Sequence, residues 1–523
     1  MNVGQTRGVR ILYRGGAIYP GAPYPGAPSA GTGEPLTSLL VDGPVISWIG
    51  SSDAAASIDA DRVIELDGAL LTPAFVDAHV HATATGLALT GVDLSGVSSL
   101  RAALDLLERS ARTGRGRPVL GSGWDETGWP EGRPPTAAEL DRAGYGGLVY
   151  LSRVDAHSAV VSSALLAAVP AARTLAGYRP DGHLRLRAHD AVRAAALSML
   201  SAGQLRAAQR ATRARAAELG IACLHEMGGP VISSAADFAG LLQLANEEPG
   251  PQVLGYWGEL MGIDRARELG AVGAGGDLFC DGSLGSHTAA LREPYADRPD
   301  TSGQLNFEAA DIAEHLRRCA AAGLQAGFHA IGDAAVDAVL AGAELASARL
   351  GRRAGAGHRL EHAEMVADPV RLAAAGFTAS VQPAFDANWG GAGGMYATRL
   401  GPLRAGGLNR FAELAAAGVE LALGSDSPVT PLAPWAAIRA ATHPHDPRSA
   451  LGLAAAFSAH TRGGWRAAGD QANGRLAVGA PATLALWRTN ESTSGLPDVG
   501  PGQRLPQCVQ TVLNGQVIFD ALS

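Results

Sequence analysis

The strongest constraint on the fold is an alternation of strand-like and helix-like segments from residue 71 to residue 470. Short apolar runs at 220–228, 323–333 and 377–383 each follow a stretch rich in Ala, Leu and Arg. In those stretches apolar residues recur at three- and four-residue spacing, which is typical of amphipathic helices. Repeated β and α units favour a parallel sheet, and a long series of them favours a closed β/α barrel.

The two ends of the chain show a different pattern. Residues 1–70 and 471–523 contain short apolar runs interrupted by Gly, Pro and Asp. Such runs are typical of strands joined by turns. We therefore expect both termini to form one small β-sandwich domain, with the barrel domain spanning 71–470.

Composition excludes several classes of function. The 523 residues include 42 basic and 50 acidic side chains, so the formal net charge is −8. This balance gives no electrostatic basis for binding nucleic acid or an anionic membrane. No apolar run is long enough to span a bilayer, no signal peptide is visible, and the cysteines form no disulfide pattern. The sequence predicts a cytoplasmic protein that binds a small molecule, and it leaves a homodimer open.

Every basic residue except histidine is arginine, because the chain contains no lysine. A Schiff-base lysine and a lysine general base are therefore excluded. A carbamylated lysine that bridges two metal ions is excluded for the same reason.

The most informative motif is TPAFVDAHVHATATG, residues 72–86. His79 and His81 share one face of its apolar strand, because residues two apart in a strand point the same way. Imidazole pairs of this kind bind Zn²⁺ and similar ions, although two hydrogen-bonded histidines at a strand end are the alternative. The position favours a metal, since barrel active sites lie at the carboxyl ends of strands.

Three later predicted strands also end in residues that can ligate a metal: His329, His362 and Asp426. Alone, His329 could be structural and Asp426 could cap a helix. A barrel brings strand ends into one ring, so together with the HxH pair they predict a metal site with a carboxylate beside it. A bound metal lowers the pKa of a water molecule to about 7, and Asp426 could accept its proton.

Two further strand ends carry polar residues. In HRLEHAEM, strict alternation would place His358, Leu360 and His362 on one face and Arg359 and Glu361 on the other. His225 and Glu226 end another strand, where only one of them can face inward, and a loop-anchoring role is favoured there.

Longer strings narrow the assignment: GSGWDETGWPEGRPPTAAELD, VDAHSAVVSSALL, FCDGSLGSHTAAL, HAIGDAAVDAV, RLEHAEM and GSDSPVTPLAPW. With the HxH pair, they make the chain resemble the amidohydrolase superfamily, and within it amidohydrolase family 3, the YtcJ-like branch that includes N-substituted formamide deformylases. The resemblance implies a TIM-like (β/α)8 barrel with a β-sandwich built from both termini. It also implies metal ligation by His79, His81, His329 and His362, with Asp426 as ligand and general base.

One position departs from the family pattern. Many relatives carry a lysine before the DGS motif, where this chain has Asp277 in GGDLFCDGSLG. A strand over 277–281 would put Asp277, Phe279 and Asp281 on one face. Asp277 could bridge two metals directly, or it could orient a histidine without touching a metal. The number of divalent ions, expected to be zinc, therefore stays open at one or two.

Other residues are weaker candidates. His287 and His157 could polarise a substrate carbonyl, and a structural role is the alternative for each. Trp124, Asp125 and Glu126 are candidates for a substrate-pocket loop, although an aromatic loop can equally be packing.

These observations predict a metal-dependent hydrolase of non-peptide C–N bonds, acting on a linear amide or N-substituted formamide. A mononuclear deaminase or cyclic-amide hydrolase is the first alternative. A non-catalytic binding protein of the same fold is the second, and the presence of all five metal-site residues argues against it.

Overall fold

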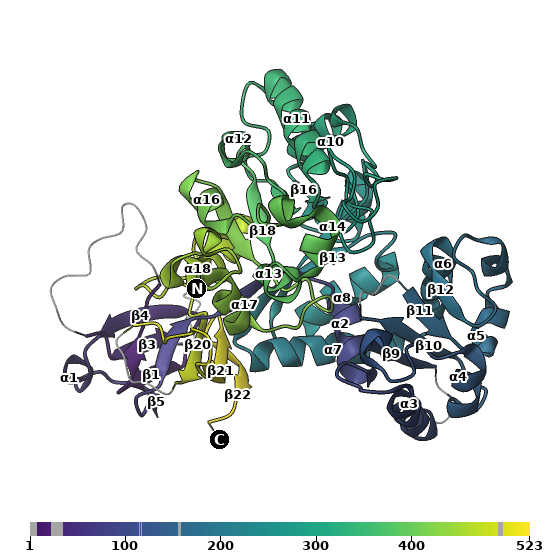
Figure 1. Cartoon of the computed structure of the whole chain (residues 1–523). Coiled ribbons are helices and arrows are strands. Elements are labelled where there is room, and N and C mark those ends of the chain that lie inside the picture. The colour runs from purple at the N-terminus through teal and green to yellow at the C-terminus, as the bar shows by residue number, and fades with distance from the viewer. Residues whose placement is uncertain are drawn as a thin grey trace. The chain divides into compact units, whose positions relative to one another are not determined.

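The computed structural model describes residues 8–21, 35–114, 116, 118–154, 158–489 and 495–522. The chain divides into two compact units (Figure 1). One consists of Met1–His81 with Arg213–Ser523, and the other of Ala82–Thr212. The domain boundaries at residues 70 and 471 stay a prediction, and the compact units group the terminal strands together with the barrel.

An eight-stranded parallel sheet forms the centre of the first unit. The sheet nearly closes into a barrel, because Val80 at the end of the first strand forms a parallel bridge with Ser427, which follows the last strand. The backbone N–H of Asp426 also donates to His79 O at 2.8 Å across this junction. The strands are β7 (Phe75–Val80), β13 (Ile221–Gly228), β14 (Gln252–Trp257), β15 (Gly273–Ala274), β16 (Gln325–Ala330), β17 (Arg359–His362), β18 (Thr378–Val381) and β19 (Glu420–Leu423).

Apart from β17, whose sequence is RLEH, the barrel strands are rich in small and apolar residues, because both of their faces are covered. Every residue of β7 and β13 is buried. The helices that follow the strands bury one side only; in α10, for example, Ile312, Leu316 and Cys319 are buried at helical spacing. The helices are α8 (Ala235–Glu247), α9 (Ile263–Glu268), α10 (Ala309–Ala322), α11 (Asp333–Leu350), α12 (Pro369–Ala375), α13 (Pro383–Trp389), α14 (Met395–Leu400), α15 (Pro402–Ala405), α16 (Phe411–Ala416), α17 (Pro434–Thr442), α18 (Leu453–Ala459) and α19 (Arg462–Ala467).

Strands from both termini form two further sheets, of orders β4-β3-β1-β5 and β2-β6-β20-β21-β22. Strand β6 pairs antiparallel with β20, which joins the two ends of the chain. A common core containing Tyr13, Leu71 and Leu484 lies between the sheets. The elements are β1 (Arg10–Arg14), β2 (Ala17–Ile18), β3 (Ser38–Asp42), β4 (Val45–Gly50), α1 (Ser52–Ala55), β5 (Arg62–Glu65), β6 (Leu70–Pro73), β20 (Leu484–Arg488), β21 (Gln507–Leu513) and β22 (Gln516–Asp520).

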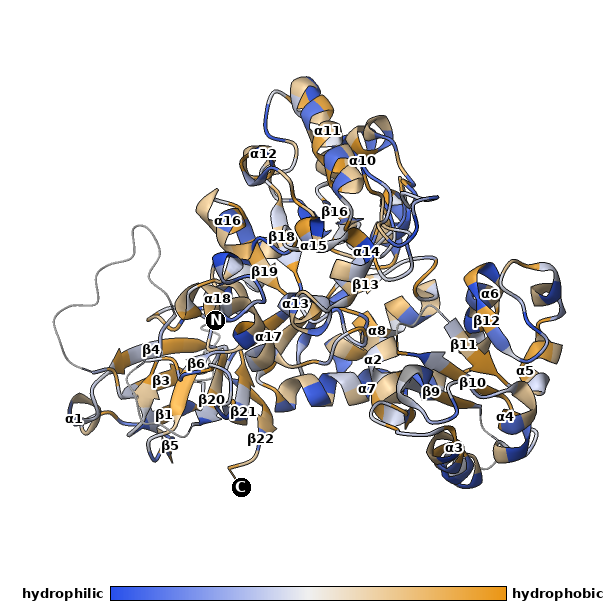
Figure 2. Cartoon of the chain, in the orientation of Figure 1, coloured by the Kyte–Doolittle hydropathy of each residue, from blue (hydrophilic) through white to orange (hydrophobic). Residues whose placement is uncertain are grey.

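The second unit has a sheet of its own, of order β12-β11-β10-β9-β8. Helix α3 buries Leu100, Ala103 and Leu107 into its core, and Figure 2 shows hydrophilic and hydrophobic colours alternating along this amphipathic helix. The elements are α2 (Ala82–Thr90), β8 (Val92–Asp93), α3 (Leu100–Gly114), β9 (Val119–Trp124), α4 (Ala137–Ala143), β10 (Val149–Arg153), β11 (Ser158–Val161), α5 (Ser163–Ala168), β12 (His183–Arg185), α6 (Leu186–Ser198) and α7 (Ala202–Glu218), which runs on past residue 212.

The structure confirms the predicted fold class, an α/β barrel with sheets from both termini. It corrects the predicted strand over 277–281. Strand β15 ends at Ala274, and the following segment is irregular apart from a bridge between Phe279 and His329. Among the described helices, none is both long and apolar enough to cross a bilayer.

Candidate metal centre

The metal-binding candidates converge at the carboxyl ends of the barrel strands. His79 lies near the end of β7 and His81 directly follows it, while His329 and His362 lie at the ends of β16 and β17. Asp277 follows β15 and Asp426 follows β19. Residues separated by up to about 350 positions in the chain thus meet, as expected for the active-site end of a β/α barrel.

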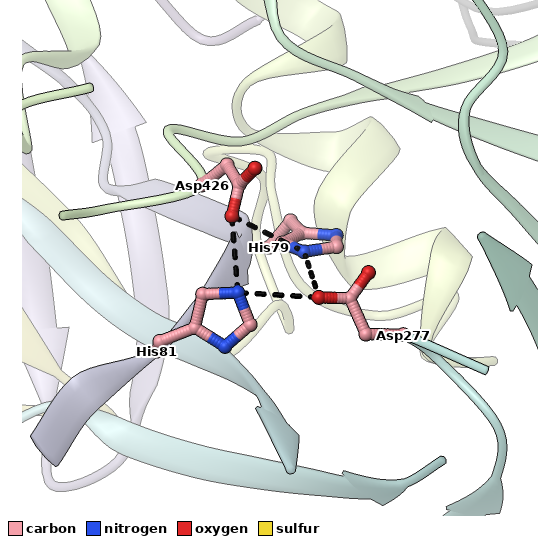
Figure 3. A group of neighbouring side chains, drawn as sticks. All are labelled: His79, His81, Asp277 and Asp426. Atoms are coloured by element: carbon pink, nitrogen blue, oxygen red, sulfur yellow. Dashed lines mark ion pairs between the residues drawn. The ribbon is translucent and has the colours of Figure 1, made fainter. Parts of the chain in front are cut away.

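The first group contains four side chains: His79, His81, Asp277 and Asp426 (Figure 3). Each offers one ligand atom, and these atoms lie within 4.8 Å of one another. The Nε2 atoms of His79 and His81 lie 3.4 and 3.2 Å from Asp277 Oδ2. The same two atoms lie 3.5 and 3.1 Å from Asp426 Oδ1. Two imidazoles and two carboxylates are a donor set that suits Zn²⁺ and related divalent ions.

The second group shares Asp277 with the first. Asp277 Oδ1 lies 3.2 Å from His329 Nδ1 and 3.3 Å from His362 Nε2. Because Oδ2 faces one pair of histidines and Oδ1 the other, a single carboxylate serves both groups. The bridging role for Asp277 and the alternative in which it only orients a histidine both stay predictions.

Two buried atoms of the first group lack hydrogen-bond partners of acceptable geometry among the described residues: His79 Nε2 and Asp426 Oδ1. A buried polar atom without a partner is costly unless an ion or ligand satisfies it. Both atoms point toward the other members of the group (Figure 3). The residues present therefore fit a divalent cation.

The electrostatics of the cluster also fit a cation. Burial alone would raise the pKa of Asp277 and Asp426, but neighbouring histidines, His79 first among them, hold both below the usual range. Burial opposes protonation of His81, yet the two carboxylates raise its pKa to about 10. The ionised carboxylates thus require positive charge nearby, which either protons on the histidines or a metal cation can supply.

Three of the histidines are oriented through the ring nitrogen that faces away from the cluster. A neutral imidazole that donates from Nδ1 leaves Nε2 free to bind a metal. The acceptors are Glu361 Oε2 for His79 at 3.0 Å, the Met227 carbonyl for His81 at 2.9 Å, and Gln382 Oε1 for His362 at 2.9 Å.

The backbone leaves regular strand geometry at two members of the cluster. His362 has a φ of 68° and Asp426 a φ of 54°, a left-handed conformation that is uncommon outside glycine. Strict alternation along RLEH, which would put Glu361 and His362 on opposite faces, is therefore wrong. Glu361 reaches His79 while His362 reaches Asp277, because the chain turns at His362.

A sequence profile of the amidohydrolase family matches residues 62–519. The chain belongs to the amidohydrolase family. This match confirms the resemblance inferred from the motifs, and it supports a hydrolase.

Two relatives of this amidohydrolase cover most of its length, and a third matches a quarter of it. YtcJ of Bacillus subtilis (strain 168) is 27% identical over an alignment of 505 positions that covers 87% of this chain and 90% of YtcJ. An uncharacterized metal-dependent hydrolase from Pyrococcus furiosus is 27% identical with a TM-score of 0.75, covering 91% of this chain and 98% of that one. An N-substituted formamide deformylase from Arthrobacter pascens is 30% identical over 135 residues, 25% of each chain.

Two of the weaker candidates are histidines. His287 pairs through Nε2 with Asp297 at 3.0 Å, and within the described residues no hydrogen bond or ion pair joins it to the cluster. His157 lies outside the described residues. The carbonyl-polarising role of both stays a prediction.

The aromatic-loop candidates belong to the second compact unit. The Trp124 side chain is buried in the core of that unit and donates to the Leu151 carbonyl at 2.8 Å; these are packing contacts, and its substrate role stays a prediction. Asp125 and Glu126 bind Arg153 at 2.8 and 3.0 Å. A substrate role for these two acids stays a prediction.

Sequence reasoning missed three residues that support the cluster. Glu361 and Gln382 accept hydrogen bonds from the candidate ligands His79 and His362, and Asp281 accepts from the backbone N–H groups of Ile331 and Gly332 beside His329. Glu361 lies in the last two residues of β17 and Gln382 directly follows β18, so a polar residue at a strand's carboxyl end was the available signal for these two. Asp281 lies in the irregular segment after β15, where no such signal exists.

Proposed function

We propose that this chain is a metal-dependent hydrolase of non-peptide C–N bonds, acting on a linear amide or an N-substituted formamide. The observation that carries the proposal is the Asp277 carboxylate shared between two histidine groups, with Asp426 facing one of them. The local similarity to an N-substituted formamide deformylase supports the choice of bond. The substrate is then a small molecule.

A divalent cation held by these residues would supply Lewis acidity toward a carbonyl and lower the pKa of a water molecule. Asp426 Oδ1 faces the histidines, which leaves Oδ2 to take up the proton of the attacking water. Asp426 then delivers this proton to the departing nitrogen, as a general base and acid. We also propose that His287, which follows Asp281 in the chain, binds the substrate carbonyl oxygen.

We further propose two zinc ions per chain. The first position would be formed by His79, His81, Asp277 and Asp426, and the second by Asp277, His329 and His362. Imidazole-rich donor sets with carboxylates are typical of zinc hydrolases.

Elemental analysis together with a substrate screen tests the function. We expect close to two divalent ions per chain and turnover of N-substituted formamides or simple linear amides. This turnover should disappear on chelation and return with Zn²⁺. Turnover confined to lactams or aminated rings would instead favour the cyclic-amide or deaminase alternative.

Metal loading is expected to be independent of bicarbonate. No carbamate can form without a lysine, and Asp277 supplies a permanent carboxylate in its place. Metal-free protein should therefore regain the same metal content and activity in buffer depleted of CO₂ as in buffer with added bicarbonate. A clear gain on adding bicarbonate would contradict the role given to Asp277.

A further inference from the structure

A fully buried ion pair lies directly behind the first metal position. Arg359 and Glu361, both on β17, have 0% exposed side chains. Arg359 Nε donates to Glu361 Oε1 at 2.7 Å, and Nη2 donates to Oε2 at 3.0 Å. This two-point contact fixes the plane of the carboxylate as well as its position.

The same carboxylate holds a ligand of the first metal position. Glu361 Oε2 lies 3.0 Å from His79 Nδ1. Since an ionised carboxylate only accepts hydrogen bonds, Nδ1 carries the proton and Nε2 is left as the ligand atom. Asp277 and Asp426 lie on that Nε2 side of the ring.

Arg359 is itself fixed on every side. Its Nη2 donates to the Ala78 carbonyl at 2.5 Å, next to His79 in the chain. Its Nη1 donates to His225 Nδ1 at 2.7 Å, and its guanidinium lies 4.5 Å from the ring centre of Tyr256. Burial and the Arg359 charge hold the pKa of His225 well below the ordinary value, so His225 is a neutral acceptor.

We propose that Glu361, locked by Arg359, is a positioning residue that fixes the tautomer and orientation of His79 and thereby sets metal affinity at the first position only. A packing role alone would not require the second carboxylate oxygen to be shared between Arg359 and His79. His362, a ligand of the second position, has a separate partner in Gln382. The two positions are therefore tuned by different residues. This inference rests on the proposed metal-dependent function.

Metal affinity of single positions tests the proposal. His329→Ala removes a ligand of the second position, so that Zn²⁺ binding at the first position can be measured. His81→Ala removes a ligand of the first position, so that binding at the second can be measured. In each background, Glu361→Gln and Gln382→Met are compared by Zn²⁺ competition against a chromogenic chelator. We expect Glu361→Gln to weaken the first position by about 10- to 100-fold and to leave the second unchanged. Gln382→Met should weaken Zn²⁺ binding at the second position and leave the first unchanged, so it is the matched control.

The proposal would be overturned if Glu361→Gln bound Zn²⁺ at the first position as tightly as its parent background does. It would also be overturned if Glu361→Gln lowered the Zn²⁺ affinity of both positions by the same factor. Absence of metal binding by the unsubstituted chain would instead refute the proposed function. Because Glu361→Gln leaves Arg359 buried and unpaired, thermal unfolding of the metal-free protein checks its fold. If that variant is unfolded, Arg359→Gln with Glu361→Gln removes both charges, and the same selective loss is expected.

Discussion

Asp426→Asn is expected to lower kcat by about 10²–10⁴-fold, the usual contribution of a general acid or base. The substitution keeps the size of the side chain and one oxygen that can face His79 and His81. It replaces the second carboxylate oxygen with an amide nitrogen, which cannot accept the proton of the attacking water. Metal content and thermal unfolding should therefore stay close to those of the unsubstituted chain while turnover is lost.

The control for this variant is Asp446→Asn, which makes the same chemical change at an acid that binds Arg448 away from the cluster. It should leave kcat unchanged. Full turnover by Asp426→Asn would remove Asp426 as the base.

Asp277→Ala is expected to be the most damaging single substitution at the metal centre. It removes the only carboxylate that contacts both pairs of histidines among the described residues. A metal centre contributes several kcal/mol to transition-state stabilisation, so activity should fall by roughly a thousandfold or more. Metal content should fall below one ion per chain by elemental analysis.

A graded series separates loss of the bridge from general damage. Asp277→Asn keeps one oxygen ligand but replaces the other with an amide nitrogen, so we expect no more than one bound ion. Asp277→Glu keeps the carboxylate on a longer side chain and should retain more metal than Asp277→Ala. Two ions bound by Asp277→Ala with near-normal activity would refute the bridging arrangement.

The barrel and most of the candidate ligands were predictable because they rest on local periodicity. Period-two alternation alone places His79 and His81 on one face, and the structure has both facing Asp277. The alternation of strands and helices predicts a barrel, and the barrel places His329 and Asp426 at one end. Both consequences need only the spacing of residues and the parallel direction of the strands.

The sequence by itself thus determined the fold class and the candidate ligands at the ends of β7, β16, β17 and β19. Only the tertiary structure decided how Asp277 and His362 are used. Asp277 follows a two-residue strand in an irregular segment, and His362 has a positive φ, so neither side chain follows the alternation rule. The sharing of Asp277 and the pairing of Glu361 with His79 arise from contacts between distant strands. Such contacts depend on how the barrel closes, which periodicity along a single strand does not specify.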